Sequence, residues 1–209
     1  MTDVKRQTRP TLRQRQAQAT RSMIAAAAQE LFLKRGYTGT TIEAVADQAG
    51  VAVSTVYAVF GSKRGILRAI RQAWHGRSHI QEVVYGDPGT SSAEQRIEQL
   101  ASATRRQWET GSEVIAIYNG AADADPDAAA ELAEALEGRR KGLRTFALSL
   151  ENHLRPGLSV DQATAILLVM CLPEVYDELV RHSGWSAEIY QEWLTQALKR
   201  ELLEGLVPA

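Results

Sequence analysis

The chain has 209 residues, with 24 Lys or Arg, 25 Asp or Glu, and a formal net charge of −1. It is longer than a small three-helix domain needs, which leaves about 130 residues for a second hydrophobic core. No apolar run reaches the roughly 18 residues of a membrane span, and no signal peptide precedes the basic N-terminal segment. We therefore expect a cytoplasmic protein with no membrane partner. The single cysteine, Cys171, excludes an internal disulfide, and its apolar surroundings in the sequence predict a buried thiol.

The charges are unevenly distributed along the chain. Residues 1–75 contain twelve Lys or Arg and four Asp or Glu, a net charge of +8, whereas the other 134 residues carry −9. A basic N-terminal part on an acidic body is typical of a protein that binds a polyanion, because phosphate neutralisation supplies most non-specific affinity for nucleic acid. The asymmetry predicts DNA as a partner but gives no sequence preference.

Residues 1–19 are polar, contain Pro10 and show no apolar period. They predict a flexible basic arm, separate from the helical part that begins near residue 20. Arg9, Arg13 and Arg15 are candidates for contacts in the minor groove, where the arms of homeodomains place arginines. A solubilising tail with no specific DNA contact is the alternative.

Three helices are predicted in the next segment, residues 20–70. The first ends near Gly36, and its apolar face comprises Ile24, Ala28, Leu31 and Phe32. The second begins at Thr40, which has the spacing of a capping box with Glu43, and it ends at Gly50. Its buried face comprises Ile42, Val45, Ala46 and Ala49.

The third helix of this segment exposes small polar side chains. Val56 and Phe60 are four residues apart and face inward, whereas the outward positions are Val53, Ser54, Thr55 and Tyr57. In a helix-turn-helix unit, here at about residues 41–60, such a face enters the major groove, where hydroxyl and methyl groups meet base edges. A simple helical hairpin is the alternative. Downstream, Ser62 is placed to cap a fourth helix.

The stretches AAQELFLKRGYTGTTIEAVADQAGV and TVYAVFGSKRGIL strongly resemble the TetR/AcrR family of bacterial transcriptional regulators over residues 20–70. The resemblance implies that the DNA-facing residues are Thr41, Val53, Ser54, Thr55 and Tyr57, and that Lys63 lies near a phosphate. Two departures stand out, because the family usually has Ser at the position of Ala52 and often His or Tyr at that of Val59. They put one helix cap and one phosphate contact in question. For Tyr57 packing between helices, and for Lys63 a solvated surface charge, are the alternatives.

The remaining residues, 71–209, predict a second domain that is helical throughout, so that the fold class is all-α. Helix breaks are expected at Gly86–Gly89, Gly111, Asp123–Pro126, Pro156–Gly157 and Ser183–Gly184. Asp125 with Pro126 makes a cap and a first helical position, and Ser159 with Gln162 forms another capping box.

The last two helices predict a homodimer. The run Ala165–Leu172 is apolar around its full circumference, and the final helix carries a wide apolar stripe, so one domain of this size is not expected to bury both. The candidate interface residues are Ile166, Met170, Tyr190, Trp193, Leu194, Ala197 and Leu198. The resemblance agrees, because the family dimerises through its last helices into a four-helix bundle. A two-fold dimer presents two recognition helices and therefore expects a palindromic operator in double-stranded DNA.

The resemblance also implies a small-molecule effector that binds among the central helices and weakens DNA affinity. The candidate pocket residues are Trp108, Tyr118, Phe146, Met170 and Tyr176, each of which is also explained as plain core. Sparse charge at these positions favours an apolar or aromatic effector. The sequence alone identifies neither this effector nor the operator.

An enzyme is poorly supported by the sequence. The four histidines, His75, His79, His153 and His182, do not form a metal-ligand pattern, and there is no phosphate loop or nucleophile elbow. We therefore predict no catalytic residue, no metal and no cofactor. The favoured interpretation is a homodimeric, effector-released repressor of transcription, with activation left open. A non-specific architectural DNA-binding protein is the alternative, although it would not need a large acidic body, and a helical small-molecule-binding enzyme comes after it.

Overall fold

A computed structural model of the chain describes residues 11–87 and 89–203, and its described residues form an all-helical fold without a β-strand. The N-terminal helices are α1 (Leu12–Arg35), α2 (Ile42–Ala49), α3 (Val53–Phe60) and α4 (Lys63–Ser78). The body contains α5 (Ile80–Tyr85), α6 (Ala93–Glu109), α7 (Ser112–Ala122), α8 (Pro126–Leu148), α9 (Val160–Met170), α10 (Pro173–Tyr176) and α11 (Ala187–Leu202). A 3-10 turn, η1 (Glu151–His153), follows α8, and a π-helical turn, η2 (Asp177–His182), follows α10.

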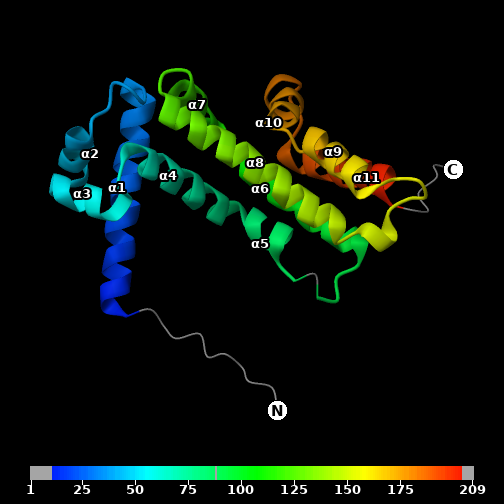
Figure 1. The fold of residues 1–209 in the computed structure, drawn as a ribbon. Coiled ribbons are helices and arrows are strands. Elements are labelled where there is room, and N and C mark those ends of the chain that lie inside the picture. Colours follow the sequence, from blue (N-terminus) through cyan, green and yellow to red (C-terminus); the bar gives the residue numbers. More distant parts are fainter. Residues whose placement is uncertain (1–10, 88, 204–209) are drawn as a thin grey trace, which may run out of the picture.

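The molecule has a small head and a larger helical body (Figure 1). The head consists of α1, α2 and α3, and α4 runs from it into the body, where it packs against α6, α7 and α8. In the body, α11 packs along α6, and α8 contacts α5, α7 and α9. The helices α2 and α3 therefore lie at the opposite end of the molecule from α9 and α11.

Helix α1 begins earlier than the sequence pattern predicted. Thr11 and Gln14 form a capping box, in which each side chain bonds the backbone of the other, and the helix continues from Leu12 to Arg35. The predicted flexible arm at residues 1–19 is therefore corrected, because residues 12–19 are helical. An apolar period was absent there because these turns project beyond the core and are exposed. Arg9 lies outside the described residues.

The start of α2 is also shifted by one residue. The cap is Thr41, whose hydroxyl accepts from the backbone N–H of Ala44 at 3.2 Å. Thr40 is buried instead, and its hydroxyl donates to the carbonyl oxygens of Leu31 (3.2 Å) and Gly36 (2.9 Å), which secures the end of α1. The predicted capping box of Thr40 and Glu43 is thus corrected. Two adjacent threonines offered the same chemistry, and packing against α1 selected between them.

Other predicted helix ends are confirmed. Gly50 ends α2 in the left-handed conformation at φ 64°, and Ala52 precedes α3 without a side-chain cap, as its missing hydroxyl predicted. The predicted caps of α4, α8, α9 and α11 are all present as side-chain hydrogen bonds from Ser62, Asp125, Ser159 and Ser186.

The turn between α3 and α4 is closed by a close backbone approach at Gly65. A Cβ atom at this position would lie 1.9 Å from the carbonyl oxygen of Phe60, which is far inside any allowed contact. Gly76, in the same helix α4, has open space around its Cβ position. The two glycines thus have opposite requirements, although their sequence context is similar.

We expect Gly65→Ala to lower the free energy of unfolding by more than about 2 kcal/mol, because the backbone of the turn must shift to relieve the clash. Gly76→Ala should instead raise it by about 0.5–1 kcal/mol, since alanine favours the helix and restricts the unfolded chain. Urea unfolding of the two variants measures both effects. Equal effects of the two substitutions would contradict the role assigned to Gly65.

Candidate nucleic-acid interface and effector cavity

The outer face of α3 carries the predicted base-reading side chains. Ser54 and Tyr57 are exposed, with half of the Tyr57 side chain accessible, and Val53 and Thr55 are partly exposed. Val56 is buried on the opposite face. The helix therefore presents hydroxyls, a phenol and a branched methyl side chain outward on an otherwise packed element, which is the composition that a major-groove helix requires.

The C-terminal end of α3 is held by α1. The guanidinium of Arg21 donates to the carbonyl oxygen of Val59 at 3.3 Å and lies 4.8 Å from the ring centroid of Phe60. These contacts neutralise a helix end and fix the angle of α3 relative to α1. Arg21 was not predicted as a functional residue. Its role depends on the contact between α1 and α3, which the sequence pattern does not show.

Two other predicted DNA-facing residues have structural tasks as well. Thr41 is exposed, and its hydroxyl caps α2. Lys63 is half-buried, with its ammonium 4.1 Å from the ring centroid of Tyr37, and this burial lowers the pKa of Lys63. The lysine thus packs on an aromatic ring at the start of α4 in the absence of DNA. Arg13 and Arg15 are exposed in the first turns of α1.

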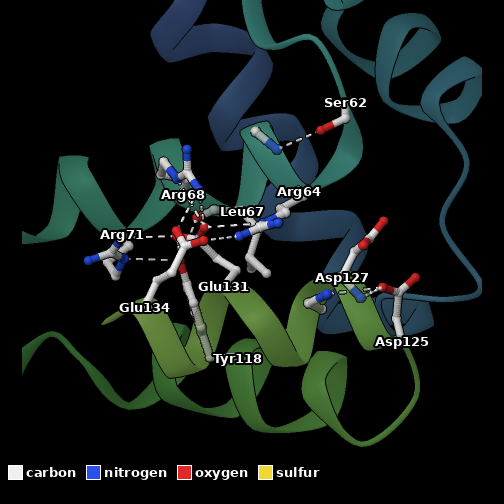
Figure 2. Close-up of polar contacts among 12 residues, drawn as sticks. Ser62, Arg64, Leu67, Arg68, Arg71, Tyr118, Asp125, Asp127, Glu131 and Glu134 are labelled. Atoms are coloured by element: carbon white, nitrogen blue, oxygen red, sulfur yellow. Dashed lines mark hydrogen bonds and ion pairs between the residues drawn. The ribbon is translucent and has the colours of Figure 1, made fainter. Parts of the chain in front are cut away.

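A buried carboxylate joins α4 to the body (Figure 2). Glu131 of α8 is fully buried and accepts from Arg68 Nε and Nη2 (2.9 and 2.7 Å) and from Arg71 Nη2 (2.9 Å). Arg64 Nε lies 3.5 Å from the same carboxylate, and Glu134 at the exposed edge pairs with both Arg64 and Arg68. We call these five residues the arginine–glutamate cluster.

The cluster keeps its central acid ionised. Burial on its own would raise the pKa of Glu131, but the hydrogen bonds from Arg68 and Arg71 outweigh it and hold the pKa below its usual value. Tyr118 of α7 lies beside them, with its hydroxyl oxygen 3.2 Å from Arg71 Nε and 3.2 Å from the carbonyl oxygen of Leu67, to which it donates. Glu131 therefore connects α4, α7 and α8 at one point.

This arrangement changes the interpretation of the charge asymmetry. Arg64, Arg68 and Arg71 were counted with the basic N-terminal part, yet their guanidinium groups bind carboxylates of the acidic body. Three of the twelve basic residues thus neutralise the protein itself. The surplus of positive charge at the head is smaller than the sequence count indicates. Among the described residues, the other cations of this part are Arg13, Arg15, Arg21, Lys34 and Arg35 of α1 and Lys63 at the start of α4.

A cavity of about 480 Å³ lies between α4, α5, α6, α7, α8 and the junction of α9 with α10. Its aromatic walls are Trp74, Tyr85, Trp108 and Tyr118. Its polar and charged lining comprises Arg71, His75, Gln81, Thr104, Gln107, Asn119, Arg139 and Glu174. A volume in this range suits a drug-sized molecule with a few oriented polar groups.

Two of the five predicted pocket residues line this cavity, and three do not. Trp108 and Tyr118 line it, but Phe146, Met170 and Tyr176 do not. Phe146 is fully buried beneath the guanidinium of Arg96, and Tyr176 packs edge-on against Tyr190. Helix position alone could not separate the cavity wall from the core, because both faces are apolar.

The lining residues that the prediction missed come from α4, α5, α6, α7 and α8 and from the α9–α10 junction, with the largest share on α8. Arg71, Trp74 and His75 have helical spacing, and this continuation of α4 beyond the head was the signal that could have placed them on one face. Burial, together with the charge of Arg71, lowers the pKa of His75 to about 4, so its imidazole is neutral at pH 7. Burial likewise raises the pKa of the Cys171 thiol to about 11.

The predicted dimer seam is corrected in part. Tyr190, Leu194, Ala197 and Leu198 are at most 2% exposed because α11 turns this stripe onto α6 and the core of its own chain. Ile166, Met170 and Trp193 remain partly exposed. Large apolar side chains that are more than half exposed nearby are Val169 of α9 (60%) and Ile189 of α11 (54%).

In the part of the chain that the structure describes, no group of three or more His, Cys, Asp or Glu side chains is placed to hold a metal ion. No described helix has both the length and the apolar character to cross a membrane.

Comparison with known proteins agrees with this head. The sequence profile of the family described as "Bacterial regulatory proteins, tetR family" matches residues 24–70, which contain the second half of α1, all of α2 and α3, and the first half of α4. Over these residues the chain matches the TetR family. A curated relative is the uncharacterized HTH-type transcriptional regulator YvkB of Bacillus subtilis (strain 168), 35% identical over 69 residues. The match spans 32% of this chain and only 36% of that relative.

Solved structures extend the likeness of the fold to the body. A putative TetR-family transcriptional regulator from Rhodococcus sp. superposes with a TM-score of 0.66 at 17% identity, over 88% of this chain and 99% of the other. NalD, the secondary repressor of the MexAB-OprM multidrug efflux pump in Pseudomonas aeruginosa, gives 0.65 at 22%, over 92% and 100%. SmeT, in a complex with triclosan, gives 0.70 at 18%, over 91% and 95%. At these identities the likeness is one of fold.

The arginine–glutamate cluster makes a stability prediction. Glu131→Gln removes the charge shared by the arginines and should lower the free energy of unfolding by about 2–4 kcal/mol, since it leaves poorly compensated cations at a buried site. Glu134→Gln, at the exposed edge, should cost less than about 1 kcal/mol. Urea unfolding at neutral pH compares the two variants. Similar losses for both would contradict the central role of Glu131.

Proposed function

We propose that this chain is a sequence-specific DNA-binding transcriptional regulator of the TetR family. The outward face of α3 carries the proposal, because Ser54, Thr55 and Tyr57 are presented together at the far end of the head, away from the body. Hydroxyl groups and the Thr55 methyl suit base edges in the major groove, while Arg13, Arg15 and the cap region around Thr41 are available to phosphates.

A second copy of the chain completes this function. The exposed side chains Val169 and Ile189, with the partly exposed Ile166, Met170 and Trp193, form an apolar face on α9 and α11. We call this set the α9–α11 face. Covering it with its own copy removes apolar surface from water and places two α3 helices about a two-fold axis. The resulting site on DNA is a palindrome.

The cavity supplies a route for regulation. Arg71 lines the cavity and binds Glu131, and Tyr118 does both as well, with its hydroxyl 3.4 Å from Glu131. A molecule that displaces either group changes the contacts between α4 and α8. Because α4 continues into the head, an effector that prefers one position of α4 shifts the separation of the two heads. Release of a repressor is the simplest outcome, and NalD is described as a repressor.

The first experiment is selection of bound sites from random duplex DNA with the purified chain. We expect a palindromic motif, and Thr55→Ala should weaken binding to that site by about 1–3 kcal/mol in a titration, because it removes one base contact. Thr145→Ala is the matched control, since Thr145 is an exposed helical threonine in the body. It should leave DNA affinity unchanged.

Two results would contradict the proposal. Recovery of no motif at moderate salt would favour an architectural DNA-binding protein. An unchanged affinity of Thr55→Ala for the selected site would exclude base reading by that side chain.

The α9–α11 face is tested by its own substitution. Val169→Glu places a charge in the proposed interface and should give monomers in sedimentation equilibrium, with DNA affinity reduced accordingly. Leu148→Glu is the control, because Leu148 is an exposed apolar residue at the end of α8 (43%) outside this face. A dimeric Val169→Glu variant would place the interface elsewhere.

A further inference from the structure

The cavity is lined by a guanidinium, that of Arg139, which is hydrogen-bonded only to backbone carbonyl groups. Arg139 Nη2 donates to the carbonyl oxygens of Leu168 (3.2 Å) and Cys171 (2.7 Å), near the end of α9. These acceptors are neutral, and none of the ion pairs among the described residues includes Arg139. Its charge is therefore not matched by a carboxylate, in contrast to Arg71, whose charge is taken by Glu131.

The other charged groups around the cavity leave it positive. Glu174 is exposed on α10 and acts on Arg139 only through space, and His75 is neutral at pH 7. The arginine–glutamate cluster, which reaches the cavity through Arg71, has three cations and two carboxylates. Partial burial lowers the pKa of Arg139, but a guanidinium stays protonated at neutral pH. A partly buried cation without a carboxylate partner favours an anionic ligand that has lost its own water.

The walls beside this cation are aromatic and fixed. The rings of Trp74 and Trp108 lie 5.4 Å apart, and each indole N–H is already bonded, to the carbonyl oxygens of Gln107 (2.8 Å) and Cys171 (3.2 Å) respectively. The Arg139 guanidinium carbon lies 5.8 Å from the centroid of Trp108. Both indole N–H groups are thus hydrogen-bonded within the protein, and the remaining ring surfaces suit contact with a flat apolar group.

We propose that the cavity binds an aromatic anion, with its acidic group held by Arg139 and its ring system packed against Trp74 and Trp108. This rests on the proposed function, since it gives the chemical class of the effector. Arg139 here acts as the residue that selects charge, while the tryptophans supply most of the contact area. Neutral molecules of the same shape bind less tightly, because they leave the Arg139 charge without a counter-ion.

Two fluorescent probes of nearly the same skeleton separate charge from shape. The anion 8-anilinonaphthalene-1-sulfonate and the neutral N-phenyl-1-naphthylamine differ by the sulfonate group, and both brighten in an apolar site. Titration of the full chain should show at least tenfold tighter binding of the anion. Energy transfer from tryptophan and competition between the probes show that both occupy the same cavity.

Substitutions at Arg139 then test the assignment. Arg139→Gln should weaken binding of the sulfonate at least tenfold and change binding of the neutral probe less than twofold, whereas Arg139→Lys should retain most of the preference. Arg140→Gln is the matched control on α8, because Arg140 is exposed and does not line the cavity. Thermal unfolding of each variant shows that the fold is intact, and the lysine variant still tests charge if Arg139→Gln is unstable.

Several outcomes would overturn the inference. These are equal affinity of the wild-type chain for the two probes, absence of binding of both, equal loss of both in Arg139→Gln, or the same loss in Arg140→Gln. Binding to the selected DNA site is measured separately without a probe. A chain that binds its operator but shows no charge preference refutes this inference alone, whereas failure to select DNA refutes the proposed function.

Discussion

The burial of one ionised carboxylate constrains the relation between the two parts of this molecule. Glu131 is fully buried on α8, and a carboxylate in such a place must be matched by cations with good hydrogen-bond geometry. Arg68 and Arg71 of α4 supply them, and Arg64 adds a longer ion pair. Because α4 begins at the turn after the recognition helix, the position of the head is tied to the electrostatics of a site in the body.

The same interaction connects the cavity to α4, which continues into the head. Arg71 and Tyr118 both line the cavity and contact Glu131, so a molecule in the cavity would compete with the buried carboxylate for the same polar groups. Packing around Gly65 keeps the turn between α3 and α4 tight, which limits how far α4 can move without carrying α3 with it. The arginine–glutamate cluster has few alternative arrangements, so a small displacement of Arg71 or Tyr118 would change the position of α4 in a discrete step.

The predictions that held concern features decided within a few residues. Caps at Ser62, Asp125, Ser159 and Ser186, and the outward face of α3, follow from local hydrogen bonding and helical period. The errors arose where two local solutions were equivalent. Thr40 and Thr41 could each cap α2. The strongly apolar stripe on α11 could pack against the core of its own chain or against a partner, and the structure shows that it packs on α6 in its own core.

The sequence by itself determined the all-helical class, the order of the helices, the helix-turn-helix unit and a basic N-terminal part, because these depend on period, caps and composition. Only the tertiary structure decided which arginines bind Glu131 and which stay exposed on α1, and which aromatic residues line the cavity rather than fill the core. The physical reason is that these choices depend on contacts between residues some 30 to 70 positions apart, such as Arg68 with Glu131 and Arg139 with Cys171. Charge and apolar period in the sequence do not specify the partner that each side chain meets.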